Sequence, residues 1–431
     1  MKRLTLMTLV AALVLALPVA ALAKADLVVA TDAPPKSMNP HAYSSDANLS
    51  YMSNFFDGLL QRKAPEGKLG PALATKWQRV DALTWKFELR KGVKYHNGNV
   101  FTAADVKFTF ERMKDPKYSK LLNIANSIAS IETPDDYTVI FKTAKPVPWF
   151  AETMHQNFIV DMESSQGRDD GDYNTRPIGT GAYELVEWVK GSYVRMKANP
   201  AYWEGAPKYR TVDIRPLTEE STRFAALASR QVDIVNGVPV TLFDRVKMMK
   251  HVEIVSRPAR RCIYMGLSNT AGTPFADIRV RQALAHAINE EEIIAKVGLK
   301  VKLDVKPKSI FFNELTDYKH QFYLIGWFDG SFDFGRSAEK LLHTPDKDKG
   351  MGTYNGGMFS NADLDAQLIA SASILDRGDR EKALQKINRM SVKDLAWIPL
   401  HYQQDIFAVV KGKNIKFTPR SDRWIVAKEI R

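Results

Sequence analysis

Trp327, Asp329 and Asp333 are the residues whose types and spacing most suggest chemistry. They follow a compact apolar run, Phe322–Gly326 (FYLIG), which is typical of a buried strand. Open α/β sheets hold their ligands beyond the carboxyl ends of the strands, where an aromatic wall and a carboxylate could contact a solute and its amine. The alternative is structural: Asp329 would cap a helix or turn, and Trp327 would pack in the core.

Signals for catalysis are weak. Asp329 and Asp333 could form an acid/base pair only if their carboxyl groups lay at the right separation, which the sequence does not give. The eight histidines lack metal-ligand spacing, and Gly179-Thr-Gly181 is too short for a phosphate loop and lacks the following lysine. There is no Gly-x-Ser-x-Gly elbow. We therefore expect a binding protein with no catalytic residues, no cofactor and no metal site.

The elements that would position these residues alternate between strand and helix patterns, which indicates an α/β fold. Trp85, Phe87 and Leu89 alternate with polar residues, as in a strand with one wet face. Thr102 and Asp105 form a capping-box pattern that begins a helix before Asp115-Pro116. Further strands are predicted at 26–31, 137–141, 398–402 and 406–410, and further helices at 277–292, 363–373 and 380–390.

The first 23 residues have the pattern of a secretory signal peptide. Lys2 and Arg3 precede an apolar run that ends in Ala21-Leu22-Ala23, and Lys24 follows. An uncleaved membrane anchor is the alternative, because about 20 apolar residues can span a bilayer. We expect cleavage after Ala23 and export from the cytoplasm. The absence of a cysteine directly after this point argues against a lipid anchor.

Charge and cysteine content exclude other classes. The chain has 61 Lys plus Arg against 49 Asp plus Glu, but the basic excess is spread along it. The short runs Arg245–Lys250 and Arg257–Arg261 are predicted to be solvated faces, so nucleic acid is not expected as a partner. An attraction to acidic ligands or anionic membranes stays open. Cys262 is the single cysteine, which excludes an internal disulfide.

Several segments together resemble a known family. The stretch Thr84–Arg112 (TWKFELRKGVKYHNGNVFTAADVKFTFER) resembles the hallmark region of the family 5 extracellular solute-binding proteins, the dipeptide- and oligopeptide-binding components of ABC importers. Further matching segments are GTGAY at 179–183, NPAYWEG at 199–205, RVRQALAHAI at 279–288 and WIPL at 397–400. The resemblance implies a bilobal, hinged α/β fold of the class II periplasmic-binding-protein type, with a subdomain inserted in the first lobe.

The resemblance also implies a division of the chain. The signal peptide is 1–23; the first lobe comprises 26–55, 170–268 and 400–431, the inserted subdomain 56–169, and the second lobe 269–399. Relatives have several dozen residues between the helix at 279–292 and the segment that begins near Ala295–Gly298, where this chain fuses the two. We therefore expect a shortened second lobe; a lobe that lacks strands would expose unpaired strand edges.

The family binds its ligand between the lobes, which implies candidate contacts here. The loop at Pro40–Asp46 suggests Ser44, Ser45 and Asp46. Relatives have a Trp followed three positions later by an Asp that holds a peptide amine; here Trp327 matches, but Gly330 stands at that position and Asp329 one earlier. Phe328 and Tyr402 are the remaining candidates, and for Tyr402 core packing is an equal alternative.

The expected function is a monomeric periplasmic receptor that captures peptides or similar small solutes for an ABC permease of the inner membrane. The solute itself stays open among dipeptides, oligopeptides, nickel chelates and sugars. The alternatives are a sensory or chaperone-like peptide-binding protein and, less favoured, a secreted hydrolase on the same scaffold. All of these proteins would bind a ligand in the same cleft. They differ in whether the bound protein docks to a permease, docks to a receptor or hydrolyses the ligand.

Overall fold

The computed structural model describes residues 24–168, 170–286, 304, 308–328 and 333–431. The predicted signal peptide at 1–23, the fusion near Ala295–Gly298 and the candidate residue Asp329 lie outside the described residues. Within the described part, no helix is long and apolar enough to cross a membrane. The residue boundaries predicted for the lobes and the insert stay predictions.

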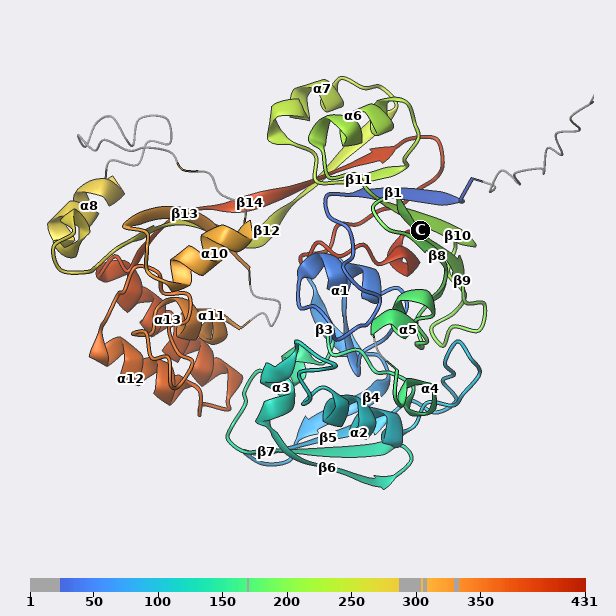
Figure 1. Cartoon of the computed structure of the whole chain (residues 1–431), viewed down its shortest axis with the longest axis horizontal. Coiled ribbons are helices and arrows are strands. Elements are labelled where there is room, and N and C mark those ends of the chain that lie inside the picture. The colour runs from blue at the N-terminus through green and yellow to red at the C-terminus, as the bar shows by residue number, and fades with distance from the viewer. Residues whose placement is uncertain (1–23, 169, 287–303, 305–307, 329–332) are drawn as a thin grey trace, which may run out of the picture.

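An eight-stranded mixed sheet runs through the molecule from one lobe to the other (Figure 1). Its central strand β1 (Leu27–Thr31) is wholly buried and pairs in parallel with β10 and β11, as expected for an apolar α/β strand. The strand order is β13-β12-β14-β11-β1-β10-β9-β8. The other bounds are β8 Tyr183–Val189, β9 Tyr193–Ala198, β10 Thr211–Pro216, β11 Ile234–Asn236, β12 Val252–Leu267, β13 Phe322–Trp327 and β14 Trp397–Val410.

Strands β12 and β14 connect the two lobes. They are 16 and 14 residues long and pair antiparallel along most of their length. The ladder is irregular between Pro258 and Cys262, where β12 carries extra residues. The prediction of two strands at 398–402 and 406–410 was wrong: the polar residues between them stay in the ladder, with Gln404 opposite Pro258, so one strand forms.

The part of the chain between β2 and β7 builds a separate four-stranded sheet with the order β4-β5-β7-β6. The predicted alternation in β5 is confirmed, since Trp85, Phe87 and Leu89 are buried and the residues between them are not. The capping box of Thr102 and Asp105 at the start of α2 is also confirmed. The bounds are β2 Leu60–Lys63, β3 Lys68–Pro71, β4 Ala74–Arg79, β5 Thr84–Leu89, α2 Ala103–Arg112, β6 Ile128–Asp135 and β7 Thr138–Thr143.

The second lobe packs helices on both faces of the outer end of the long sheet. One face carries a core that includes Tyr264, Leu341 and Ile387, and the other carries Met265 and Leu284. The helices are α8 Ile278–His286, α10 Lys308–Thr316, α11 Phe334–Leu341, α12 Ala362–Ser371 and α13 Arg377–Lys393. The helices predicted at 363–373 and 380–390 thus correspond to α12 and α13, and α8 begins where the Asp277 cap was expected.

Shorter helices complete the first lobe and the insert. Helix α1 follows the loop after β1, whereas α6 and α7 lie over the long sheet at the top of Figure 1. Their bounds are α1 Asp46–Met52, α3 Leu122–Ser127, α4 Met162–Ser165, α5 Asp170–Thr175, α6 Glu220–Ala228 and α7 Phe243–Lys247.

Candidate ligand-binding cleft

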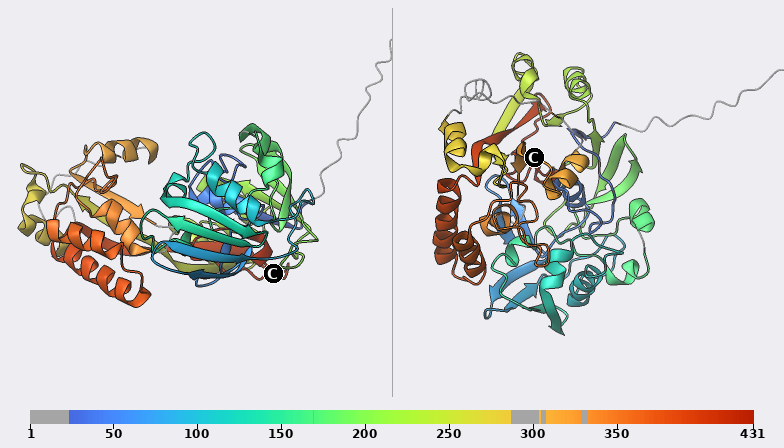
Figure 2. Two further views of the ribbon diagram at one scale, coloured as in Figure 1. Left: turned by 90° about the horizontal axis from the view of Figure 1, so that it is seen from below. Right: turned by 60° about the vertical axis from the view of Figure 1, so that its left-hand side comes forward.

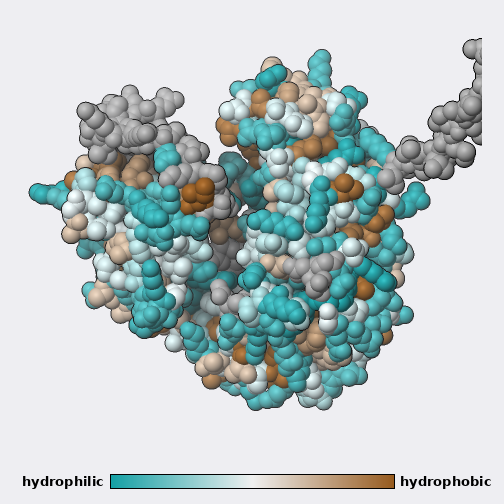
Figure 3. Space-filling view, in the orientation of Figure 1, coloured by the Kyte–Doolittle hydropathy of each residue, from teal (hydrophilic) through white to brown (hydrophobic). Residues whose placement is uncertain are grey.

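A furrow lies between the second lobe and the first lobe in the space-filling view (Figure 3). Strands β12 and β14 bridge it (Figure 1). Residues that project from these strands at the crossing can therefore be reached from the furrow. We take this region as the candidate site.

Three residues line up across the neighbouring strands at this crossing. Cys262 on β12 lies opposite Trp327 on β13 and, on its other side, opposite Tyr402 on β14. Directly opposed residues of antiparallel strands project from the same face of a sheet. Two inter-strand spacings separate the backbones of Trp327 and Tyr402, or about 10 Å. The fold thus brings together two predicted site residues that are far apart in the sequence.

Trp327 has a fixed orientation at the margin of the second-lobe core. Its indole Nε1 donates a hydrogen bond to Ser337 Oγ at 3.1 Å. Its ring lies 5.2 Å from the ring of Tyr354, tilted by 50°. The side chain is half-buried and packs against the core, so it is both a packing residue and a possible wall of the cleft. Phe328, which follows it, is also half-buried.

Tyr402 is 65% exposed. A side chain with that exposure contributes little to a core, so the packing alternative does not describe it. An aromatic ring held on a hinge strand, with both a polar tip and an apolar face available, is suited to contact a ligand.

The loop before α1 belongs to the first lobe. Ser44 and Ser45 are exposed, and Asp46 is half-buried as the first residue of α1. Ser45 occupies the N-cap position but makes no capping hydrogen bond through its side chain. These hydroxyl groups are accessible polar groups, as a first-lobe contact with a solute requires.

Asp333 has a structural role. Its carboxylate accepts hydrogen bonds from Arg380 Nε at 3.0 Å and Nη2 at 2.9 Å. It also caps α11 by accepting from the backbone N–H of Arg336. Both side chains of this ion pair are largely buried. A carboxylate bound in this way is poorly placed for proton transfer, which weighs against an acid/base pair of Asp329 and Asp333.

The hinge also carries charged residues that sequence reasoning missed. Asp405 on β14 is buried, and Arg423 Nε lies 2.9 Å from its Oδ1. Burial raises the pKa of the Asp405 carboxyl group. The run Arg257–Arg261, predicted as a solvated face, is part of β12, and its Arg257 is half-buried. The basic run was the available signal, but only the pairing of β12 with β14 places it at the hinge.

Arg260 illustrates the electrostatics of this region. Its Nη2 donates to the Glu66 carbonyl at 3.1 Å. Burial, with the positive charges of Arg62 and Arg257, lowers the pKa of Arg260 to about 10. Arginine charges thus lie near one another at this end of β12.

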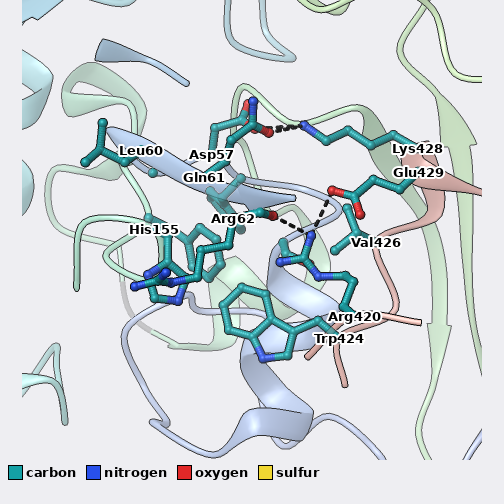
Figure 4. A pocket seen from close by; sticks show the side chains of 14 residues that line it. Asp57, Leu60, Gln61, Arg62, His155, Arg420, Trp424, Val426, Lys428 and Glu429 are labelled. Carbon is teal, nitrogen blue, oxygen red and sulfur yellow. Dashed lines mark hydrogen bonds and ion pairs between the residues drawn. The ribbon is translucent and has the colours of Figure 1, made fainter. Parts of the chain in front are cut away.

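A small cavity lies between β2 and the C-terminal segment (Figure 4). Arg420 Nη1 donates to the Arg62 carbonyl at 2.6 Å and to Glu429 Oε1 at 2.8 Å, and Asp422 also binds Arg420. Burial lowers the pKa of His155, at its wall, to about 3. The cavity volume is about 30 Å³. Ligand pockets are on the order of 300–1,000 Å³, so this cavity holds water at most and belongs to the structure.

Among the described residues, no group of three His, Cys, Asp or Glu side chains could hold a metal ion. Cys262 is a free thiol whose pKa is raised by burial. What the described cleft offers is therefore aromatic surface, hydroxyl groups and a cationic hinge.

Comparison with curated proteins gives relatives of one kind. The chain is 29% identical over 285 residues to the periplasmic oligopeptide-binding protein of Salmonella typhimurium, covering 61% of this chain and 52% of that protein. It is 27% identical over 327 residues to the dipeptide-binding protein of Escherichia coli, covering 68% and 61%. A glutathione-binding protein of Salmonella choleraesuis is 29% identical over 278 residues, covering 64% and 54%. The aligned part thus spans only about half to three fifths of these relatives.

Solved structures share the fold. A periplasmic binding protein of Helicobacter pylori, in complex with the peptide STSA, superposes with a TM-score of 0.78 at 21% identity, covering 94% of this chain and 96% of that chain. HbpA2 of Haemophilus parasuis superposes with a TM-score of 0.80 at 19% identity, covering 94% of this chain and 99% of that chain. The predicted bilobal periplasmic-binding-protein fold is confirmed by these structures.

A family model supplies the last finding. The model described as bacterial extracellular solute-binding proteins, family 5 Middle, matches residues 68–301, more than half of the chain. This segment includes the stretch Thr84–Arg112 on which the resemblance was based. The chain belongs to the family 5 bacterial extracellular solute-binding proteins.

Proposed function

We propose that this protein captures peptides or similar small solutes between its two lobes in the periplasm and delivers them to an ABC permease. The observation that carries the proposal is the alignment of Trp327 and Tyr402 beside Cys262, on the strands that join the lobes. Relatives named for binding oligopeptides, dipeptides and glutathione support the ligand class. Export after cleavage at Ala23 and a monomeric state are parts of the same proposal.

Binding needs no covalent chemistry. A ligand that touches both lobes favours the arrangement in which they are close, by the difference between its affinities for the closed and open forms. Trp327, Phe328 and Tyr402 supply apolar walls for side chains. Ser44, Ser45 and Asp46 supply polar contacts from the first lobe. The permease then meets the closed form.

The ligand's charged ends would be held at separate places. Asp329 is the candidate for the amine, by analogy with the family motif that it matches with a shift of one residue. The arginines near Arg260 are the candidate for an acidic group, because a carboxylate is attracted to their positive charges. A free peptide carries both groups, whereas a neutral sugar carries neither.

Titration with defined peptides tests the proposal. The exported protein, first unfolded and refolded to release any bound ligand, is titrated with Met-Leu, Ser-Thr-Ser-Ala and glutathione while tryptophan fluorescence is followed. We expect a saturable change for at least one peptide and a weaker response in Tyr402→Ala. The absence of a saturable response to any peptide, nickel chelate or sugar would contradict the proposal.

A further inference from the structure

Two contacts join the second lobe to the insert that contains the four-stranded sheet, away from the hinge strands. The guanidinium group of Arg336, on α11, lies over the ring of Trp149 at 5.0 Å from its centroid. Arg79, at the end of β4, donates from Nη1 to the Leu375 carbonyl at 2.7 Å. Figure 2 (left) shows helices of the second lobe beside this sheet. The insert thus meets the far lobe directly.

On the insert side, the residues that make both contacts pack against one aromatic core. Trp85 stacks on Phe150 with ring centroids 5.8 Å apart, and Phe150 directly follows Trp149 in the chain. The Arg79 guanidinium lies 6.0 Å from the centroid of Trp85. Because Phe150 is fully buried, the backbone of Trp149 is held in a fixed place.

On the second-lobe side, the contact residues are tied to the ion pair of Asp333 and Arg380. Asp333 accepts from the backbone N–H of Arg336, and Arg380 also donates to the Ser371 carbonyl near the end of α12. Leu375 lies in the connection between α12 and α13. Arg380 is therefore connected to Arg336 through Asp333, and it holds the end of α12, four residues before Leu375.

Helix α11 also connects this contact with the cleft. Ser337, which binds the indole of Trp327, is the residue after Arg336. A shift of α11 relative to the insert would therefore move the residue that holds Trp327. Helix α11 thus carries both the residue that contacts the insert and the residue that holds Trp327.

We infer that Arg336–Trp149 and Arg79–Leu375 form a latch that keeps a measurable part of the ligand-free protein closed and raises the affinity for every ligand without touching it. The inference rests on the proposed function for its effect on ligands, but the latch itself requires none. A contact between the lobes exists only when they are close, so its free energy adds to the closed state alone. Where the open form predominates, loss of the contact lowers the affinity for every ligand by the same factor.

The size of the effect follows from the kind of contact. A cation–π pair at a partly exposed site changes an equilibrium by about two- to fivefold. We expect Arg336→Ala to lower the ratio of closed to open protein by this factor. Trp149→Leu removes the same interaction and should lower this ratio similarly. In the double variant, the ratio of closed to open protein should decrease by about as much as in the more strongly affected single variant.

The test measures distances in the ligand-free protein. Spin labels are attached at Lys76→Cys on β4 and Lys382→Cys on α13, in a Cys262→Ser background, and the distance distribution is recorded by pulsed electron spin resonance. The expected result is a short-distance population that shrinks in Arg336→Ala and in Trp149→Leu, and is partly retained in Arg336→Lys. Arg389→Ala, which removes an exposed arginine of α13 away from Leu375, is the matched control and should leave this population unchanged.

Two results would overturn the latch. One is a wild-type distribution without a short-distance population; the other is a population that Arg336→Ala leaves unchanged in a protein whose thermal unfolding is unaltered. Since no ligand is present, neither result depends on whether peptides bind. If no peptide gave a saturable response but Arg336→Ala still reduced the short-distance population, the proposed function would be refuted and the latch would be supported.

Discussion

Trp327 donates its indole N–H to the hydroxyl of Ser337, 3.1 Å away on α11. Ser337 is buried, so Ser337→Ala leaves an indole donor without its partner. We expect a loss of about 1–2 kcal/mol in the free energy of unfolding and weaker peptide binding. Denaturant unfolding and fluorescence titration measure the two effects. Ser373→Ala removes an exposed hydroxyl of the same lobe and should change neither; equal effects of both variants would contradict the role of Ser337.

Tyr402→Ala separates a ligand contact from a packing contact. Because the side chain is 65% exposed, its removal should change the unfolding free energy by less than about 0.5 kcal/mol. Peptide affinity should fall, and Tyr402→Phe should retain most of it if the ring face makes the contact. Calorimetric titration and thermal unfolding of the same samples provide the comparison. A strongly destabilised variant with unchanged affinity would show that the ring packs instead.

Asp329→Ala tests the proposed amine contact. A carboxylate that pairs with the ligand amine should matter more for peptides with a free N-terminus than for acetylated ones. We expect the variant to lose affinity for free-amine peptides and to bind blocked peptides almost as well as the wild type does. Asp348→Ala, an exposed carboxylate elsewhere in the second lobe, is the control. Equal losses for both kinds of peptide would refute the amine role.

Asp333→Ala should destabilise the second lobe strongly. It leaves the guanidinium of Arg380 buried without its carboxylate partner, which typically costs about 3–5 kcal/mol. The matched variant Asp379→Ala breaks an exposed pair with Lys382, where the loss of stability should be much smaller because water screens the two charges. Chemical denaturation of both variants gives the difference. Similar stabilities would mean that the buried pair contributes no more than the exposed one.

The buried histidines predict that stability falls in acid. Burial lowers the pKa of His41 and of His155 to about 3, whereas an unfolded histidine titrates near 6.5. Between these values the unfolded chain binds more protons than the folded one, so stability is present above about pH 6.5 and is lost as the pH falls toward 3. Each histidine adds a slope of roughly 1.4 kcal/mol per pH unit.

A variant that lacks one of these histidines measures how much that residue contributes to the pH dependence of stability. His155→Phe should reduce the slope of unfolding free energy against pH by roughly 1.4 kcal/mol per unit below pH 6. Urea unfolding at a series of pH values measures it. An unchanged slope would show that His155 does not enter the linkage. Because the variant also alters packing near Trp424, the slope and not the absolute stability is compared.

Local patterns predicted the fold well where each element carries its own signal. The alternation around Phe87 and the capping box at Thr102 depend on neighbours a few residues away, so the sequence alone indicates them. The single strand β14 could not be predicted in the same way. The polar residues in its middle predict an interruption of the strand, and only pairing with β12 keeps the backbone extended there.

The site was harder to predict, because exposure and contact between lobes are tertiary properties. Trp327 was predicted from its place after an apolar strand as well as by resemblance, and Tyr402 by resemblance alone. Whether Tyr402 packs or faces solvent depends on the strands around it. The contact of Arg336 with Trp149 has no local signal at all, since the two residues come from different lobes. Asp333 matched the pattern of a reactive carboxylate, although Arg380, which holds it, lies on α13.

Mass spectrometry of the exported protein tests the central claim most directly. The protein is purified from the periplasm without unfolding, its mass is recorded under native and denaturing conditions, and the released small molecules are identified. The account predicts a native mass that exceeds the denatured mass by one bound solute, and peptides among the released molecules. Equal masses, together with no mass shift on addition of a peptide mixture, would contradict a receptor that closes around such a solute.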